Sequence, residues 1–146
     1  MNFGEIPWIK EHTELYRKDP EKAHLWDASA AGGSGLLPTL LLTTTGRKSG
    51  QPRDLPLIYG EHGDAYVVIA SKGGWPTHPA WFLNLEANPE CDLMVGPKKL
   101  RARARVAEGD ERETLWKRMV EIYPPYTEYQ EKTERQIPVV VLDPVG

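Results

Sequence analysis

Six short segments rich in β-branched and apolar residues follow one another along the chain, and mostly tight turns separate them. The chain does not alternate strands with long helices, as a parallel doubly wound sheet would require. The pattern therefore predicts an α+β fold, a small and mostly antiparallel barrel with peripheral helices. The six expected strands are residues 39–45, 53–59, 65–71, two strands on either side of the turn at 96–97, and 137–142.

An amphipathic helix is predicted at the N-terminus, because residues with apolar surface recur on one helical face and a proline follows. The residues of this pattern are Trp8, His12, Leu15, Tyr16 and Pro20. We expect residues 1–22 to form this helix and residues 23–146 to form the barrel domain.

Further helices are expected in the second half of the chain. A short one begins after Pro79. Asp110 and Glu113 have the spacing of a capping box, so a longer helix is predicted to begin there. A last short helix is expected to carry Tyr126 and Tyr129.

The composition excludes several classes of protein. With 146 residues, 40% hydrophobic and 27% charged, the chain fits one folded domain. Its net charge of -3 argues against a general nucleic-acid binder. A single cysteine rules out an internal disulfide framework, and no apolar run is long enough to span a bilayer. We expect a cytoplasmic protein.

The common catalytic and metal-binding motifs are missing from the sequence. There is no G-x-S-x-G elbow, P-loop or H-E-x-x-H, and the four histidines have no metal-site spacing. Cys91 stands between Glu90 and Asp92, whose carboxylates raise a thiol pKa, so a structural role is expected. If the chain is an enzyme, a bound cofactor should supply the chemistry.

A group of cations and hydroxyls stands in or beside glycine-containing turns. Backbone N–H groups at such turns can approach an anion closely, which suits a phosphorylated or carboxylated ligand. Hairpins with solvated charges are the alternative interpretation. The residues concerned are Arg47, Lys48, Ser49, Arg53, Ser71 and Lys72.

Aromatic residues with polar tips gather near the same part of the chain. Trp75 and Trp81 flank one loop, and Tyr123, Tyr126 and Tyr129 recur at every third residue. Such side chains suit the wall of a pocket for a flat ring. Core packing is an alternative for Trp81.

Four segments together resemble the deazaflavin-dependent nitroreductase family of actinobacteria, over roughly residues 24–143. That resemblance implies a split β-barrel related to FMN-binding pyridoxamine-phosphate oxidases, with coenzyme F420 as the cofactor. The N-terminal residues 1–22 carry no such likeness. The four segments are LLLTTTGRKSG at 40–50, VVIASKGG at 67–74, HPAWFLN at 78–84 and YPPYTEYQEKT at 123–133.

The resemblance implies which residues form the site. Phe82 departs from relatives, which often have tyrosine there. The acceptor pocket is expected to hold the catalytic candidates Ser71, Tyr123, Tyr126 and Tyr129. The expected F420 contacts are Arg47, Lys48, Ser49, Arg53, Asp54, Leu55, Pro56, Leu57, Ile58, Ile69, Ala70, Ser71, Lys72, Ala80, Trp81, Phe82, Leu83, Asn84 and Tyr126.

The implied function is an F420H2-dependent reductase that transfers a hydride to a small organic acceptor, a quinone, nitroaromatic or similar activated double bond. An FMN-binding split-barrel oxidoreductase and a non-catalytic F420 carrier or sensor are the alternatives. The expected partner is the small acceptor, without nucleic acid or a bound metal. A monomer and a homodimer are both compatible, and peripheral membrane contact is an alternative if the acceptor is a quinone.

Overall fold

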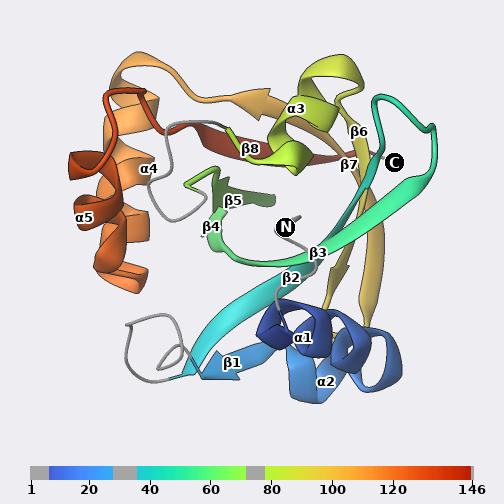
Figure 1. Cartoon of the computed structure of the whole chain (residues 1–146). Helices are drawn as coiled ribbons and strands as arrows, with labels where there is room; N and C mark the ends of the chain where they lie inside the picture. The colour runs from blue at the N-terminus through green and yellow to red at the C-terminus, as the bar shows by residue number, and fades with distance from the viewer. Residues whose placement is uncertain (1–6, 28–35, 72–77, 146) are drawn as a thin grey trace.

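The computed structural model describes residues 7–27, 36–71 and 78–145 (Figure 1). In these residues five helices surround an eight-stranded antiparallel sheet. The helices are α1 Pro7–Lys18, α2 Pro20–Ala23, α3 Ala80–Ala87, α4 Gly109–Ile122 and α5 Pro125–Glu131. The strands are β1 Leu25–Asp27, β2 Leu36–Thr45, β3 Pro52–Ile58, β4 Gly60–His62, β5 Ala65–Ile69, β6 Glu90–Val95, β7 Lys98–Val106 and β8 Val139–Val145.

The sheet is wrapped around itself without closing through hydrogen bonds. Its strand order is β1-β2-β6-β7-β8-β5-β4, and β3 pairs with β2 outside this path. Tyr59 alone separates β3 from β4, so one segment pairs with β2 at one end and with β5 at the other. This confirms the α+β, mostly antiparallel barrel that the strand pattern predicted and the split barrel that the family resemblance implied.

The central strands are apolar on both faces, because side chains that alternate along a strand enter two different cores. On β8, Val140 and Leu142 point into the barrel core, which also holds Leu40, Leu42 and Trp81. The alternate β8 residues enter an outer core beneath α4 and α5. Members of the outer core include Val67, Leu115, Met119, Tyr123, Tyr126, Ile137, Val139 and Val141.

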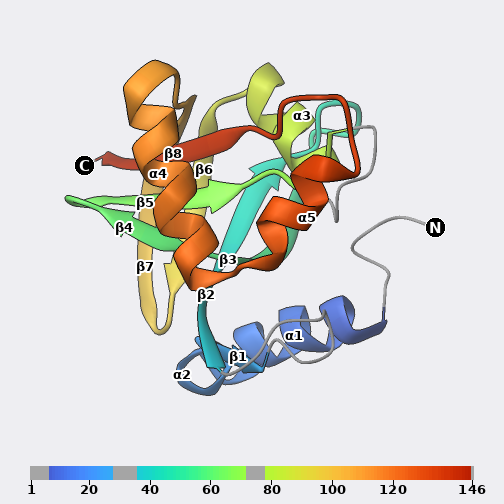
Figure 2. The same cartoon turned by 90° about the vertical axis from the view of Figure 1, so that its left-hand side faces the viewer.

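Helix α1 covers a different part of the barrel and lies below the sheet in Figure 2, apart from α4 and α5. The expected apolar face of this helix is confirmed at His12 and Tyr16, which are buried. The Tyr16 hydroxyl donates to the Thr39 carbonyl oxygen at 2.7 Å and accepts from the Gly96 N–H at 2.8 Å. One side chain thereby joins α1 to β2 and to the β6–β7 turn.

Two details of the predicted secondary structure are wrong. The sheet of the described residues has eight strands where six were expected, because the three-residue strands β1 and β4 are too short to produce a pattern. Helix α4 begins at Gly109, and its N-cap residue Glu108 makes no side-chain capping bond. Asp110 therefore lies in the first turn, where its charge favours the helix dipole, and the predicted capping box does not form.

The helices within the described segments are all too short or too polar to cross a lipid bilayer.

Replacement of Tyr16 by phenylalanine should destabilise the protein, because the Thr39 carbonyl and the Gly96 N–H lose their common buried partner. We expect Tyr16→Phe to lower the free energy of unfolding by about 1–3 kcal/mol in a urea titration. Tyr66→Phe is the matched control, since the Tyr66 hydroxyl has no hydrogen-bond partner among the described residues. Equal losses in the two variants would contradict the docking role of Tyr16.

Candidate active site

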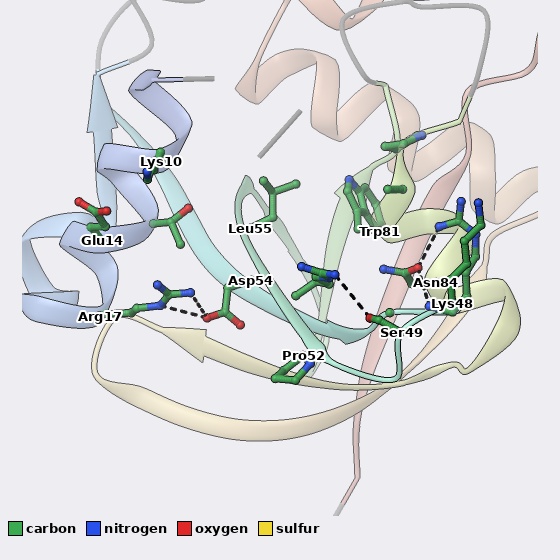
Figure 3. A pocket seen from close by; sticks show the side chains of 16 residues that line it. Lys10, Glu14, Arg17, Lys48, Ser49, Pro52, Asp54, Leu55, Trp81 and Asn84 are labelled. Carbon is green, nitrogen blue, oxygen red and sulfur yellow. Dashed lines mark hydrogen bonds and ion pairs between the residues drawn. The ribbon is translucent and has the colours of Figure 1, made fainter. Parts of the chain in front are cut away.

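A cleft of about 600 Å³ lies between α1, the β2–β3 turn, β3 and the start of α3. Figure 3 shows Lys10, Glu14 and Arg17 on one side, Asp54 and Leu55 in the middle, and Trp81 and Asn84 opposite. Its volume is in the range usual for small-molecule sites. The cleft is lined by Lys10, Thr13, Glu14, Arg17, Gly46, Arg47, Lys48, Ser49, Pro52, Arg53, Asp54, Leu55, Pro79, Ala80, Trp81 and Asn84.

The β2–β3 turn holds its cations in a fixed loop. The Gly46 N–H donates to the Gln51 carbonyl oxygen at 2.8 Å, and the Gly50 N–H donates to the Gly46 carbonyl oxygen at 2.8 Å. Gly50 has a φ of 71°, in the left-handed region that favours glycine. A Cβ on Gly46 would lie 2.7 Å from the Ser49 Oγ and 3.2 Å from the Gln51 carbonyl oxygen, so a side chain there would displace the Ser49 hydroxyl.

Asn84 connects this turn to α3. Its side chain is buried, and its Oδ1 accepts from the backbone N–H of Arg47 at 3.2 Å and from the Arg47 Nη1 at 3.1 Å. Its Nδ2 donates to the Thr44 hydroxyl at 3.1 Å. A single amide thus orients the Arg47 guanidinium and holds the turn against the helix.

Asp54 connects β3 to α1. Its Oδ2 accepts from the Arg17 Nη2 at 2.7 Å and from Arg17 Nε at 3.1 Å, and its Oδ1 accepts from the Thr43 hydroxyl at 2.7 Å. An exposed ion pair contributes little stability by itself. Its geometric effect is to hold α1 beside β3, so that the helix forms one wall of the cleft.

The cleft is cationic although the chain is acidic overall. Five cationic side chains and two carboxylates line it, a difference of three positive charges, whereas the whole chain carries -3. Lys10 and Lys48 have no ion-pair or hydrogen-bond partner among the described residues. The Arg53 Nη2 makes one weak contact, with the Ser49 Oγ at 3.4 Å. These groups remain available to an anionic ligand.

The cleft gathers half of the expected F420 contacts. Lys72 lies outside the described residues, as does Trp75. The expected contacts that line the cleft are Arg47, Lys48, Ser49, Arg53, Asp54, Leu55, Ala80, Trp81 and Asn84. Nine other expected contacts are among the described residues but do not line the cleft: Pro56, Leu57, Ile58, Ile69, Ala70, Ser71, Phe82, Leu83 and Tyr126.

Sequence reasoning missed the wall that α1 provides. Lys10, Thr13, Glu14 and Arg17 all line the cleft from this helix. Their spacings of three and four residues put them on one polar face, which was visible in the sequence. The sequence pattern could not indicate that this polar face lies opposite β3 and the β2–β3 turn.

The three predicted tyrosines do come together, at the outer core. The Tyr123 and Tyr129 hydroxyl oxygens lie 2.9 Å apart, and the Tyr126 ring meets the Tyr123 ring edge-on at 4.9 Å between centroids. Tyr123 and Tyr126 are buried, and that burial raises the pKa of both phenols. Both are protonated at neutral pH and are poor proton donors, so hydrogen bonding is the role available to them.

Cys91 has the structural role that was expected. It is buried in the barrel core, and its Sγ lies 3.6 Å from the Ala102 carbonyl oxygen. Burial first, and the neighbouring Asp92 second, raises the pKa of the thiol to about 12. Such a thiol is not a nucleophile at neutral pH.

A split barrel with a cationic cleft at a tight hairpin has the charge that an anionic small-molecule ligand requires. The family model described as F420H(2)-dependent quinone reductase matches residues 8–144. The chain belongs to this family. It is therefore an oxidoreductase that depends on reduced coenzyme F420.

Individual relatives agree with the family model. An F420H(2)-dependent quinone reductase of Mycobacterium tuberculosis is 39% identical over 146 residues, covering 92% of this chain and 95% of the relative. A solved F420-H2 dependent reductase, FDR-A, is 50% identical, with a TM-score of 0.68 over 73% of this chain and 94% of its own. A second structure, described as a domain-swapped dimer, is 43% identical, with a TM-score of 0.71 over 94% of this chain and 98% of its own.

The residues present fit coenzyme F420. Its phosphate and oligoglutamate tail are anionic, which suits the unpaired cations of the cleft. The turn at 46–50 contributes Gly46, Arg47, Lys48 and Ser49 to the same cleft. Leu55 and Trp81 supply apolar wall beside the charged groups.

Removal of the Asn84 amide should weaken cofactor binding, because the Arg47 guanidinium and the turn lose their anchor on α3. We expect Asn84→Ala to raise the Kd for F420 by about tenfold, the effect of one hydrogen bond to a charged group. Fluorescence titration of the cofactor measures this. Asn88→Ala is the control, because Asn88 contacts the Glu90 N–H and does not line the cleft. Similar affinities for the two variants would refute the anchoring role.

Proposed function

We propose that this protein transfers a hydride from reduced F420 to a quinone-type acceptor, and that the acceptor lies beside the tyrosine cluster. The observation that carries the proposal is the course of β3. Pro52 to Leu55 line the cationic cleft, whereas Ile58 packs against the outer core that contains Tyr123 and Tyr126. At about 3.3 Å per residue the strand spans about 20 Å, enough to accommodate an elongated cofactor.

In this proposal the anionic end of the cofactor lies on the cationic turn. Arg47, Lys48 and Arg53 hold its phosphate and carboxylates, with Lys10 of α1 on the opposite wall. Trp81 and Leu55 cover its middle. The deazaflavin ring then lies near Leu57 and Ile58. Of the remaining expected contacts, Ser71 belongs to the ring end of the same path.

Bound F420 supplies the hydride, and the residues of the chain orient the acceptor. The site must keep water away and stabilise the negative charge that reaches the acceptor. Hydroxyls of Ser71, Tyr126 and the Tyr123–Tyr129 pair are candidates for that hydrogen bond. Because burial raises the pKa of Tyr123 and Tyr126, solvent rather than either phenol delivers the final proton.

The cellular setting belongs to the same proposal. We place the protein in the cytoplasm, with peripheral membrane contact when its quinone acceptor is lipid-bound. A small-molecule acceptor is its partner. The relative described as a domain-swapped dimer makes a homodimer a reasonable alternative to a monomer.

The proposal predicts selectivity for both cofactor and acceptor. The protein should bind F420 with a Kd in the micromolar range, about −8 kcal/mol, and bind FMN at least about tenfold more weakly. F420H2 oxidation should be faster with a soluble quinone than with a nitroaromatic. Side-by-side titrations and steady-state rates measure both. Comparable FMN affinity would favour a flavin enzyme, and cofactor binding without turnover would favour a carrier or sensor.

Tyr126 offers a test of the acceptor site. Tyr126→Phe keeps the ring and removes the donor, so kcat should fall by about ten- to a hundredfold while F420 affinity changes little. The matched variant Tyr66→Phe should retain the kcat of the parent protein. If Tyr126→Phe turns over like the parent while Tyr126→Ala fails, the residue provides only the wall of the pocket.

A further inference from the structure

Arg135 lies in the connection between α5 and β8, and among the described residues its guanidinium contacts the end of β5 and the approach to α3. Its Nη2 donates to the Ser71 carbonyl oxygen at 2.6 Å, and its Nη1 donates to the Ala70 carbonyl oxygen at 3.1 Å. The same Nη1 lies 2.9 Å from the Nδ1 of His78. Within the described part of the chain, the guanidinium therefore donates to three acceptors.

These acceptors belong to the end of β5 and to the approach to α3. Ala70 and Ser71 follow β5 directly, and His78 precedes the first residue of α3 by two positions. In sequence, residues 72–77 connect the two sides, and they lie outside the described part of the chain. The guanidinium thus connects the end of β5 to the segment just before α3 through side-chain hydrogen bonds.

Helix α3 contributes three residues to the lining of the cleft, Ala80, Trp81 and Asn84. His78 is also held to this helix, because its ring packs on the Phe82 ring with 4.9 Å between centroids. A displacement of His78 would therefore move the start of α3, and with it the amide that anchors Arg47. Through this chain of contacts Arg135 acts on the cofactor cleft without lining it.

Arg135 is itself held in place by α5. The Gln130 Nε2 donates to the Arg135 carbonyl oxygen at 2.8 Å, and the Gln130 Oε1 accepts from the Ile137 N–H at 2.9 Å. Helix α5 also carries Tyr126 and Tyr129. The same connection therefore links the tyrosine cluster to the β5–α3 junction.

The contacts require arginine and a neutral histidine. A lysine ammonium is a point charge and cannot present the same fork to acceptors on two segments. The Nδ1 of His78 must accept from Arg135, so the ring proton is on Nε2. Burial first, and the charge of Arg135 second, lowers the pKa of His78, which keeps the ring neutral at physiological pH.

We propose that Arg135 is a positioning residue for the reaction: its guanidinium sets the spacing between β5 and α3, and so the alignment of the bound cofactor with the acceptor beside α5. This inference rests on the proposed function. Hydride transfer depends on sub-ångström alignment, so loss of the spacing should affect both cofactor affinity and kcat.

The test compares Arg135→Gln and Arg135→Lys with the parent protein, at a temperature where circular dichroism reports all of them folded. We expect both variants to raise the Kd for F420 by roughly tenfold and to lower kcat with a soluble quinone. If Arg135→Lys restores the parent's affinity, the charge of Arg135 attracts the anionic cofactor and the positioning role is wrong.

Arg112→Gln is the matched control. Arg112 also donates to a backbone carbonyl of the same connection, that of Ile137 at 2.8 Å, and it has no hydrogen bond to the described residues of the β5–α3 junction. Its variant should keep the Kd for F420 within about twofold of the parent value. Equal effects of Arg112→Gln and Arg135→Gln would reduce Arg135 to a stabiliser of the connection and overturn the proposal.

A second variant covers the case in which Arg135→Gln does not fold. His78→Phe preserves an aromatic ring against Phe82 and leaves the two carbonyl bonds of Arg135, but removes the Nδ1 acceptor. We expect it to raise the Kd for F420 by about threefold or more. An unchanged Kd overturns the proposal. A parent protein that binds no F420 instead overturns the proposed function, and the two failures are thereby distinguished.

Discussion

The central strands of the barrel are apolar on both faces, and this constraint governs what surrounds them. Leu40 and Leu42 of β2 fill the barrel, while Leu41 between them packs with Tyr16 of α1. β8 is covered in the same way, by the barrel on one face and by α4 and α5 on the other. Helices α1, α4 and α5 therefore remove a second apolar surface from water, and such burial is the dominant favourable contribution to folding.

The helices also form walls of the cationic cleft. Helix α1, which buries Leu41, turns its polar face toward β3 and becomes a wall of the cleft. Helix α3 closes the barrel core with Trp81 and Phe82, and its Asn84 orients Arg47. An acidic chain thus concentrates positive charge in one cleft, because the backbone holds cations from distant segments together. This is the condition for attracting an anionic cofactor selectively.

Two structural links run between the cleft and the tyrosine cluster. The strand β3 extends from one to the other, so a cofactor that follows it reaches both. The connection between α5 and β8 provides the second link, through the guanidinium of Arg135. A hydride donor and an acceptor held by different elements need such a link, because small errors of position reduce the rate greatly.

The sequence by itself determined the features that depend on near neighbours: the long strands, the glycine turn with its cations, the N-terminal helix and the run of tyrosines. It did not reveal β1 and β4, because a strand of three residues is too short to show an alternation of apolar and polar side chains. Nor could it reveal the pairs that build the site. Arg17 meets Asp54 across 37 residues, and Arg135 meets Ser71 across 64. Such contacts leave no local pattern, because they exist only once the sheet wraps and brings those segments together.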